Sequence, residues 1–170
     1  MPDLTQGAEP LPRLAVGRAR PPAREWSSVE SFYQAAKFAG VAGAEHIVAG
    51  IAASESPEEA ARVGRRAQRA SPELVRGDWD EIKVEVMRAA LRAKFTAHAG
   101  PRELLLRTAS EDHDGGPLAL VEASPHDYFW GRGRDGSGSN MLGVLLMELR
   151  QELLLGTGTD PAARSLEGAV

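Results

Sequence analysis

Apolar side chains recur every three or four residues over most of the chain between residues 28 and 155. This spacing puts them on one face of a helix, and it predicts a series of amphipathic helices. Ser56-Pro57 and Ser71-Pro72 each place an N-cap residue before a proline, and Asp78 is a third candidate start. The predicted helices cover residues 28–39, 42–53, 57–69, 78–98, 101–108 and 141–155.

Strand patterns are scarce by comparison. Only residues 118–122, Leu-Ala-Leu-Val-Glu, have the character of a strand. Residues 1–24 are rich in proline and have little apolar periodicity, so we expect an irregular segment there. We expect a flexible tail over residues 156–170. The prediction is a single compact domain over residues 25–155, of α+β class, predominantly helical and with a small strand component.

Composition limits the classes of protein. A chain of 170 residues with 42% hydrophobic content is long enough for one core and too short to expect two. The absence of cysteine excludes disulfides, thiolate nucleophiles and thiolate-bound metals, and it fits a cytoplasmic protein. No apolar run approaches the roughly 18 residues that span a bilayer, and the N-terminus lacks the apolar core of a signal peptide. We therefore expect neither membrane insertion nor secretion.

The net charge of -4 gives no global attraction to nucleic acid. The best local basic patch is Arg62, Arg65, Arg66 and Arg69, at helical spacing. Such a row of arginines is more often a solvated helix face than a nucleic-acid site. The charge pattern therefore favours a small-molecule partner over DNA or RNA.

The segment from Asp127 to Asn140 holds three aromatic residues, two arginines and four glycines just before the last predicted helix. Glycines let a backbone approach a ligand closely, and exposed aromatics usually stack on something. Asn140 is a suitable N-cap, and the helix N–H groups behind it would face an anion. A solvated, turn-rich loop explains the glycines equally well, but the aromatics favour a ligand-binding loop.

A second group of polar residues lies in the predicted helix over residues 28–39. Glu30, Gln34 and Lys37 are spaced i, i+4 and i+7, which places an acid, an amide and an amine on one side of the helix. Apolar neighbours flank this stripe, so it can line a pocket. The other interpretation is a surface helix with ordinary polar pairs, and periodicity leaves both open.

In the predicted helix over residues 78–98, Trp79 belongs to a face that can be buried, and Lys83 lies near its edge. A lysine in that position is partly desolvated, which lowers its pKa and makes its amine a better base or nucleophile. Most of this helix is otherwise expected to be core.

Three motifs occur in order: Glu30–Phe38, Trp79–Phe95 and Ser124–Arg150. Together they resemble the YbiA/NADAR family of N-glycosidases, over about residues 26–153. The resemblance implies a mainly helical α+β domain that cleaves the bond between a ribose carbon and an exocyclic nitrogen. It implies no metal and no organic cofactor.

Two substrate classes follow from the resemblance. One is a small phosphorylated ribosylamino-heterocycle, an early riboflavin-pathway intermediate in which an amino-pyrimidine is joined to ribose 5-phosphate. The other is ADP-ribose attached to guanine bases of nucleic acid. A third alternative is a module that binds nucleotide or ADP-ribose without catalysis. Loss of turnover in a Glu30→Gln variant would distinguish an enzyme from such a module.

The resemblance also suggests roles for residues. Glu30 and Asp127 are candidates to activate water and stabilise positive charge on the ribose, as carboxylates do in glycoside hydrolysis. Lys37 is a candidate to exchange with the departing base through a Schiff base. The predicted catalytic residues are thus Glu30, Lys37 and Asp127. The predicted substrate-binding residues are Trp26, Gln34, Trp79, Lys83, Trp130, Gly131, Arg132, Gly136, Gly138 and Asn140.

The N-terminal region departs from the family pattern. Relatives usually carry a Phe-Ser-Asn-Phe-like motif before the first helix, whereas residues 1–25 contain neither Asn nor Phe. Ser31 stands where a histidine is common. The missing asparagine motif would help to shape the base or ribose side of a site. The departure leaves two alternatives, an enzyme with altered base specificity and a protein that has lost activity. Because Glu30, Lys37 and Asp127 are present, we expect activity.

Overall fold

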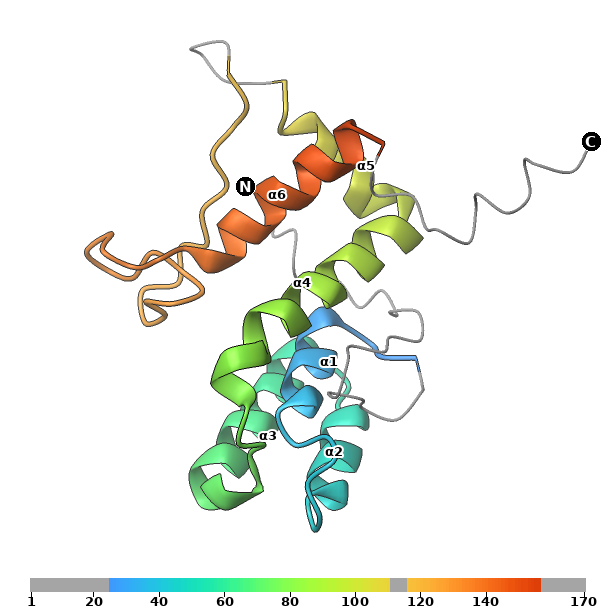
Figure 1. The fold of residues 1–170 in the computed structure, drawn as a ribbon, viewed down its shortest axis with the longest axis vertical. Helices are drawn as coiled ribbons and strands as arrows, with labels where there is room; N and C mark the ends of the chain where they lie inside the picture. Colours follow the sequence, from blue (N-terminus) through green and yellow to red (C-terminus); the bar gives the residue numbers. More distant parts are fainter. Residues whose placement is uncertain (1–24, 111–115, 157–170) are drawn as a thin grey trace, which may run out of the picture. The chain divides into compact units, whose positions relative to one another are not determined.

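The computed structural model describes residues 25–110 and 116–156 (Figure 1). The predictions for residues 1–24 and 157–170 lie outside the described residues. The described chain divides into two compact units, one ending at His98 and the other beginning at Ala99. No helix in the described ranges combines the length and the apolar character needed to cross a bilayer.

In the first unit the described residues, 25–98, form helices and one isolated bridge at Trp26. In it α1 contacts α2, α3 and α4, and α2 also contacts α3. Helix α1 is only eight residues long, and every residue in it except Glu30 is buried. So short a helix is stabilised by packing more than by intrinsic propensity. The elements are α1 (Val29–Ala36), α2 (Glu45–Ala52), α3 (Pro57–Ala70), the 3₁₀ turn η1 (Pro72–Leu74) and α4 (Trp79–Ala97).

The start of α1 is fixed by a reciprocal capping box. Ser28 Oγ accepts the main-chain N–H of Ser31 at 3.0 Å, and Ser31 Oγ accepts the main-chain N–H of Ser28 at 3.0 Å. Both side chains are buried, so each satisfies a donor that would otherwise be left unpaired. Ser31 occupies the position where histidine is common. Its side chain stabilises the start of α1.

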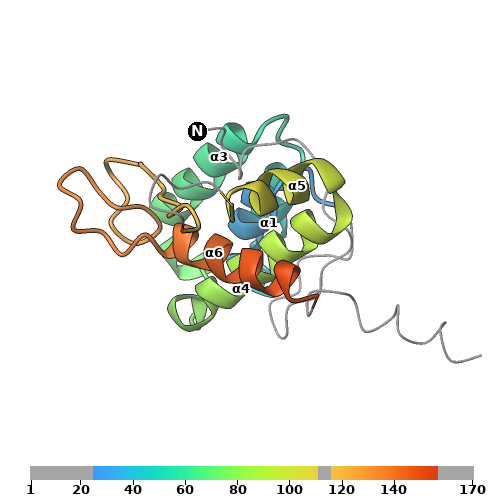
Figure 2. The same ribbon diagram turned by 90° about the horizontal axis from the view of Figure 1, so that it is seen from above.

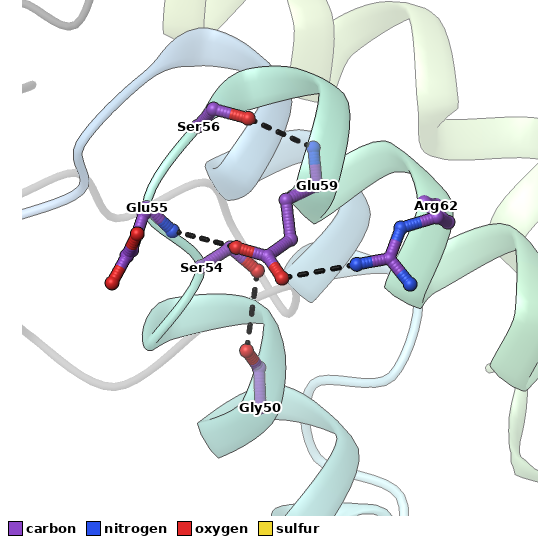
Figure 3. A network of polar contacts seen from close by, with 6 residues as sticks. All are labelled: Gly50, Ser54, Glu55, Ser56, Glu59 and Arg62. Carbon is purple, nitrogen blue, oxygen red and sulfur yellow. Dashed lines mark hydrogen bonds and ion pairs between the residues drawn. The ribbon is translucent and has the colours of Figure 1, made fainter.

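The connection between α2 and α3 is held by a small polar network (Figure 3). Ser56 Oγ accepts the main-chain N–H of Glu59 at 3.1 Å, and Glu59 Oε2 accepts that of Glu55 at 3.0 Å. Arg62 donates to the other oxygen of Glu59 at 3.0 Å. The Ser56-Pro57 start predicted from the sequence is confirmed.

The second unit contains α5 (Ala99–Arg107) and α6 (Met141–Leu154), which contact each other. Figure 2 shows residues 116–140 as an irregular segment that leads into α6. All six helices predicted from the sequence are confirmed, with ends that differ by a few residues. The buried positions on α6 follow helical spacing: Leu142, Leu145, Leu146, Leu149 and Leu153.

The predicted strand over residues 118–122 is wrong. Three of its main-chain groups bond to side chains, and none of the described residues forms a strand beside it. Arg150 donates to the carbonyl of Leu118 at 2.8 Å, and Asn140 bonds Leu120 and Glu122. The described residues are therefore predominantly helical, and the strand component expected for an α+β domain is absent from 118–122.

Candidate functional site

The Lys37 amine lies in an apolar and aromatic setting in the first unit. Lys37 is the C-cap of α1, and its side chain is buried, with 6% of the residue exposed. Its Nζ is 5.3 Å from the centroid of the Tyr33 ring and 5.9 Å from that of Trp79. The two rings meet edge to face at 5.0 Å. The main-chain N–H of Arg76 donates to the Lys37 carbonyl at 2.9 Å, which anchors the backbone.

Burial lowers the pKa of the Lys37 amine from its usual 10.5 to about 8. Glu30 works in the opposite direction and raises this pKa, whereas the cations Arg65 and Lys83 lower it. At a pH near 8, Lys37 is therefore a neutral amine in a large fraction of the molecules, and the neutral amine is the nucleophilic form. Lys37 is therefore suited to act as a nucleophile.

The same burial predicts a pH-dependent penalty in stability. The folded pKa of about 8 lies below the unfolded value of 10.5, so the unfolded state binds more protons between them and stability rises with pH there. A Lys37→Met variant is therefore expected to be more stable than the wild type near pH 7, by up to about 3 kcal/mol. Urea denaturation from about pH 7 to pH 10 measures the difference. An advantage that does not shrink as the pH rises would contradict the assignment.

Glu30 and Gln34 form the rest of the predicted stripe. Gln34 Nε2 donates to Glu30 Oε1 at 2.8 Å, and Gln34 is buried. Its Oε1 is buried against α3 with no hydrogen-bond partner among the described residues. A Cβ on Gly64 would lie 2.3 Å from this oxygen, so only glycine lets α3 come so close to Gln34. The structure thus brings Glu30, Gln34 and Lys37 together, as predicted.

Trp79 and Lys83 of α4 complete this group. Trp79 is buried against Tyr33. Lys83 donates to Asp80 at 2.7 Å, and its charge lowers the pKa of Lys37.

Trp26 is 2% exposed and meets Phe32 edge to face at 6.1 Å. So little exposed surface leaves nothing for a substrate to stack on. We therefore assign Trp26 to the core instead of to the substrate side.

Gln68 is a residue of this group that the sequence analysis missed. The Nζ of Lys37 donates to Gln68 Oε1 at 3.1 Å, from α1 to α3. The contact joins residues 31 positions apart, so no local spacing indicates it.

The row of four arginines lies on α3, the helix that also carries Gln68. All four are exposed, as the residues of a solvated helix face would be: Arg62, Arg65, Arg66 and Arg69.

In the second unit, the loop from Asp127 to Asn140 folds back on itself. Five consecutive main-chain N–H groups, from Gly138 to Leu142, donate to the carbonyls of residues 128–132 at 2.8–3.1 Å. The N–H groups of Met141 and Leu142 are those at the start of α6. The expectation that they would face an anion is wrong, because the loop itself already satisfies them.

The loop's glycines are required by this folding. A Cβ on Gly138 would lie 2.4 Å from the Gly131 carbonyl oxygen, and one on Gly131 would lie 2.9 Å from that of Asp127. Gly136 has a positive φ of 80°, which favours glycine. The glycines therefore have a structural role in the described loop, whatever ligand it binds. Arg132 and Gly136 are exposed and remain candidates to meet a ligand.

Asp127 and Asn140 hold the two ends of the loop. Asp127 Oδ1 accepts the main-chain N–H groups of Phe129 at 2.9 Å and Trp130 at 2.7 Å. One oxygen of this carboxylate therefore shapes the turn, which presents Trp130 edge to face with Phe129 at 5.0 Å. The expected N-cap role of Asn140 is wrong: Asn140 adopts a left-handed conformation, with φ 49°, and its side chain makes no capping bond.

The Asn140 side chain instead bridges two main-chain groups of the preceding segment. Its Nδ2 donates to the Leu120 carbonyl at 2.9 Å, and its Oδ1 accepts the N–H of Glu122 at 2.9 Å. The sequence-predicted residues thus gather as one group around Lys37 and a second group in this loop. Across residues 25–110 and 116–156, the His, Asp and Glu side chains form no cluster of three or more that would hold a metal ion.

Comparison with known proteins decides the family. The NADAR domain matches residues 14–154. The chain belongs to the NADAR domain family. It is 44% identical over 128 residues to N-glycosidase Npun_R5314 of Nostoc punctiforme, covering 75% of this chain and 74% of that protein. It is 43% identical to N-glycosidase YbiA of Escherichia coli over 132 residues, covering 78% and 73% of the two chains.

The NMR structure of E. coli YbiA is similar to this NADAR chain, with a TM-score of 0.67 and 39% identity, covering 88% of this chain and 76% of that one. The chain is also 50% identical over 140 residues to the chloroplastic riboflavin biosynthesis protein PYRR of Zea mays. That match covers 81% of this chain and only 21% of the maize protein. The NADAR chain thus spans about a fifth of the plant relative. The resemblance to N-glycosidases predicted from the motifs is confirmed.

Proposed function

We propose that this NADAR chain is an N-glycosidase that hydrolyses the C–N bond between ribose 5-phosphate and an amino-pyrimidine. The observation that carries the proposal is the Lys37 amine, which is buried beside two aromatic rings and has a pKa lowered to about 8. An amine that is partly neutral near physiological pH is suited to attack the sugar carbon C1′ once that carbon is part of an imine. The names of the bacterial and plant relatives support an N-glycosidase on a riboflavin-pathway type of substrate.

The proposed reaction begins at the ribosylamine. The exocyclic nitrogen forms a C1′=N imine as the C1′–O4′ bond breaks, and O4′ takes up a proton. Lys37 Nζ then adds to C1′ and passes a proton to the departing nitrogen, so that the amino-pyrimidine leaves and Lys37 is joined to C1′ as an imine. Water hydrolyses this imine, which returns the free lysine and ribose 5-phosphate.

In this proposal Glu30 serves the proton transfers. Glu30 raises the pKa of Lys37, and Gln34 Nε2 donates to Glu30 Oε1 at 2.8 Å. Such a carboxylate can accept a proton from the attacking amine or from water. In this proposal Trp79 and Lys83 flank the sugar. The roles of Asp127, Trp130 and Arg132 in the loop remain predictions from the family resemblance.

Two substrates presented separately test the proposal. The full chain is incubated with a riboflavin-pathway ribosylamino-pyrimidine phosphate and, in parallel, with ADP-ribosylated guanosine, and the released base is measured by mass spectrometry. We expect release from the first. Release from the second alone would replace the substrate assignment, and binding without release from either would favour a recognition module.

A further inference from the structure

Helices α1 and α3 meet through two neighbouring contacts. Gln34 lies against Gly64, and Lys37 bonds to Gln68. Gly64 and Gln68 are four residues apart on α3, and Gln34 and Lys37 are three apart on α1, so each pair lies along one face of its helix. The missing side chain at Gly64 lets the helices approach, and the next turn of α3 then brings Gln68 Oε1 within 3.1 Å of the lysine Nζ.

We infer that Gln68 is a positioning residue that holds the Lys37 amine for attack on the substrate; the inference rests on the function proposed above. A lysine carries its amine on a flexible four-carbon stem and loses considerable rotamer freedom when held. One N–H donated to Gln68 Oε1 fixes the rotation about the Cε–Nζ bond. The lone pair of the neutral amine is then restricted to directions away from Gln68.

The chemical type of residue 68 matters for the charge on the amine. A glutamine accepts a hydrogen bond without adding a negative charge, so it orients the amine and still permits the neutral form. A glutamate at the same point would stabilise the ammonium form. The other charged groups that act on Lys37 are Glu30 of α1, Arg65 of α3 and Lys83 of α4.

Labelling of Lys37 tests the contact without any substrate. The full chain is treated with acetic anhydride over a range of pH, and acetylation of the Lys37 peptide is followed by mass spectrometry. In Gln68→Glu we expect the midpoint for Lys37 labelling to move to higher pH by about one unit. In Gln68→Leu we expect it to move lower, because the acceptor that favours the ammonium form is lost. Unmoved midpoints in both variants would overturn the inference.

A matched control is Gln151→Glu, which makes the same change of charge at an exposed position of α6. It is expected to leave the Lys37 midpoint where it is in the wild type. An equal shift in this control would assign the effect to net charge and overturn the inference. Because Gln68 is itself exposed, both of its variants are expected to fold.

Turnover then tests positioning. With the ribosylamino-pyrimidine phosphate as substrate, Gln68→Leu is expected to lower kcat about tenfold with little change in KM, since an interaction specific to the transition state is lost. Unchanged kcat beside a shifted midpoint would overturn the positioning role. If the wild-type chain releases no base, the proposed function fails, whereas the labelling midpoints still decide whether Gln68 governs the amine.

Discussion

Replacing Lys37 with alanine is expected to lower base release by about a thousandfold or more, because the proposed nucleophile is removed. Borohydride added during turnover should reduce the imine to a stable secondary amine between Lys37 Nζ and C1′ of the sugar. The adduct is measured as a mass increase on the peptide that contains Lys37. Wild-type protein should carry it, and Lys37→Ala should not.

Lys37→Arg is the matched control. A guanidinium keeps the positive charge beside Tyr33 and Trp79 but stays protonated and forms no imine. Loss of release in both variants supports covalent catalysis. An active arginine variant, or an active alanine variant without a trapped adduct, would exclude the imine and leave attack by water with Glu30 as the base. A Glu30→Gln variant would then be the one to lose activity.

The helices were predictable because their information is local. The i, i+4 and i+7 spacing of Glu30, Gln34 and Lys37 is enough to place them on one face, and Ser56 before Pro57 is enough to begin α3. The same spacing left the interpretation open between a pocket and a surface helix. Burial of Gln34 and Lys37 excludes the surface helix, and no pattern within α1 contains this information.

The features that the sequence did not indicate depend on contacts between distant residues. Gln68 is a polar residue of the kind that is common on solvated helix faces, so its sequence position gives no sign of a buried partner. Its bond to Lys37 forms because Gly64 lets α1 and α3 approach each other. Residues 118–122 have the apolar character of a strand. Their main-chain groups, however, bond to the side chains of Asn140 and Arg150 instead of to a neighbouring strand. Asn140 was likewise predicted to be an N-cap from its place before α6. In the structure it has a left-handed conformation, and its side chain bridges the main chain of Leu120 and Glu122 instead.

Gly143 of α6 is expected to be among the positions where an alanine is least tolerated. A Cβ there would lie 2.2 Å from the Leu120 carbonyl oxygen and 2.4 Å from Asn140 Nδ2. The main chain at Leu120 cannot yield as a flexible side chain does, so the Asn140 bridge is strained or broken. Overpacking of this kind costs about 1–3 kcal/mol, and it outweighs the gain of at most about 1 kcal/mol that alanine brings to a helix.

Gly50→Ala is the control for this prediction. Gly50 lies at an exposed position of α2, and a Cβ there would meet only Val63 Cγ1, at an ordinary contact distance of 3.9 Å. The same substitution should therefore be neutral or stabilising by up to about 1 kcal/mol. Urea denaturation of both variants gives the comparison. Equal stabilities would contradict the close approach of Gly143 to the Leu120 carbonyl and to the Asn140 side chain.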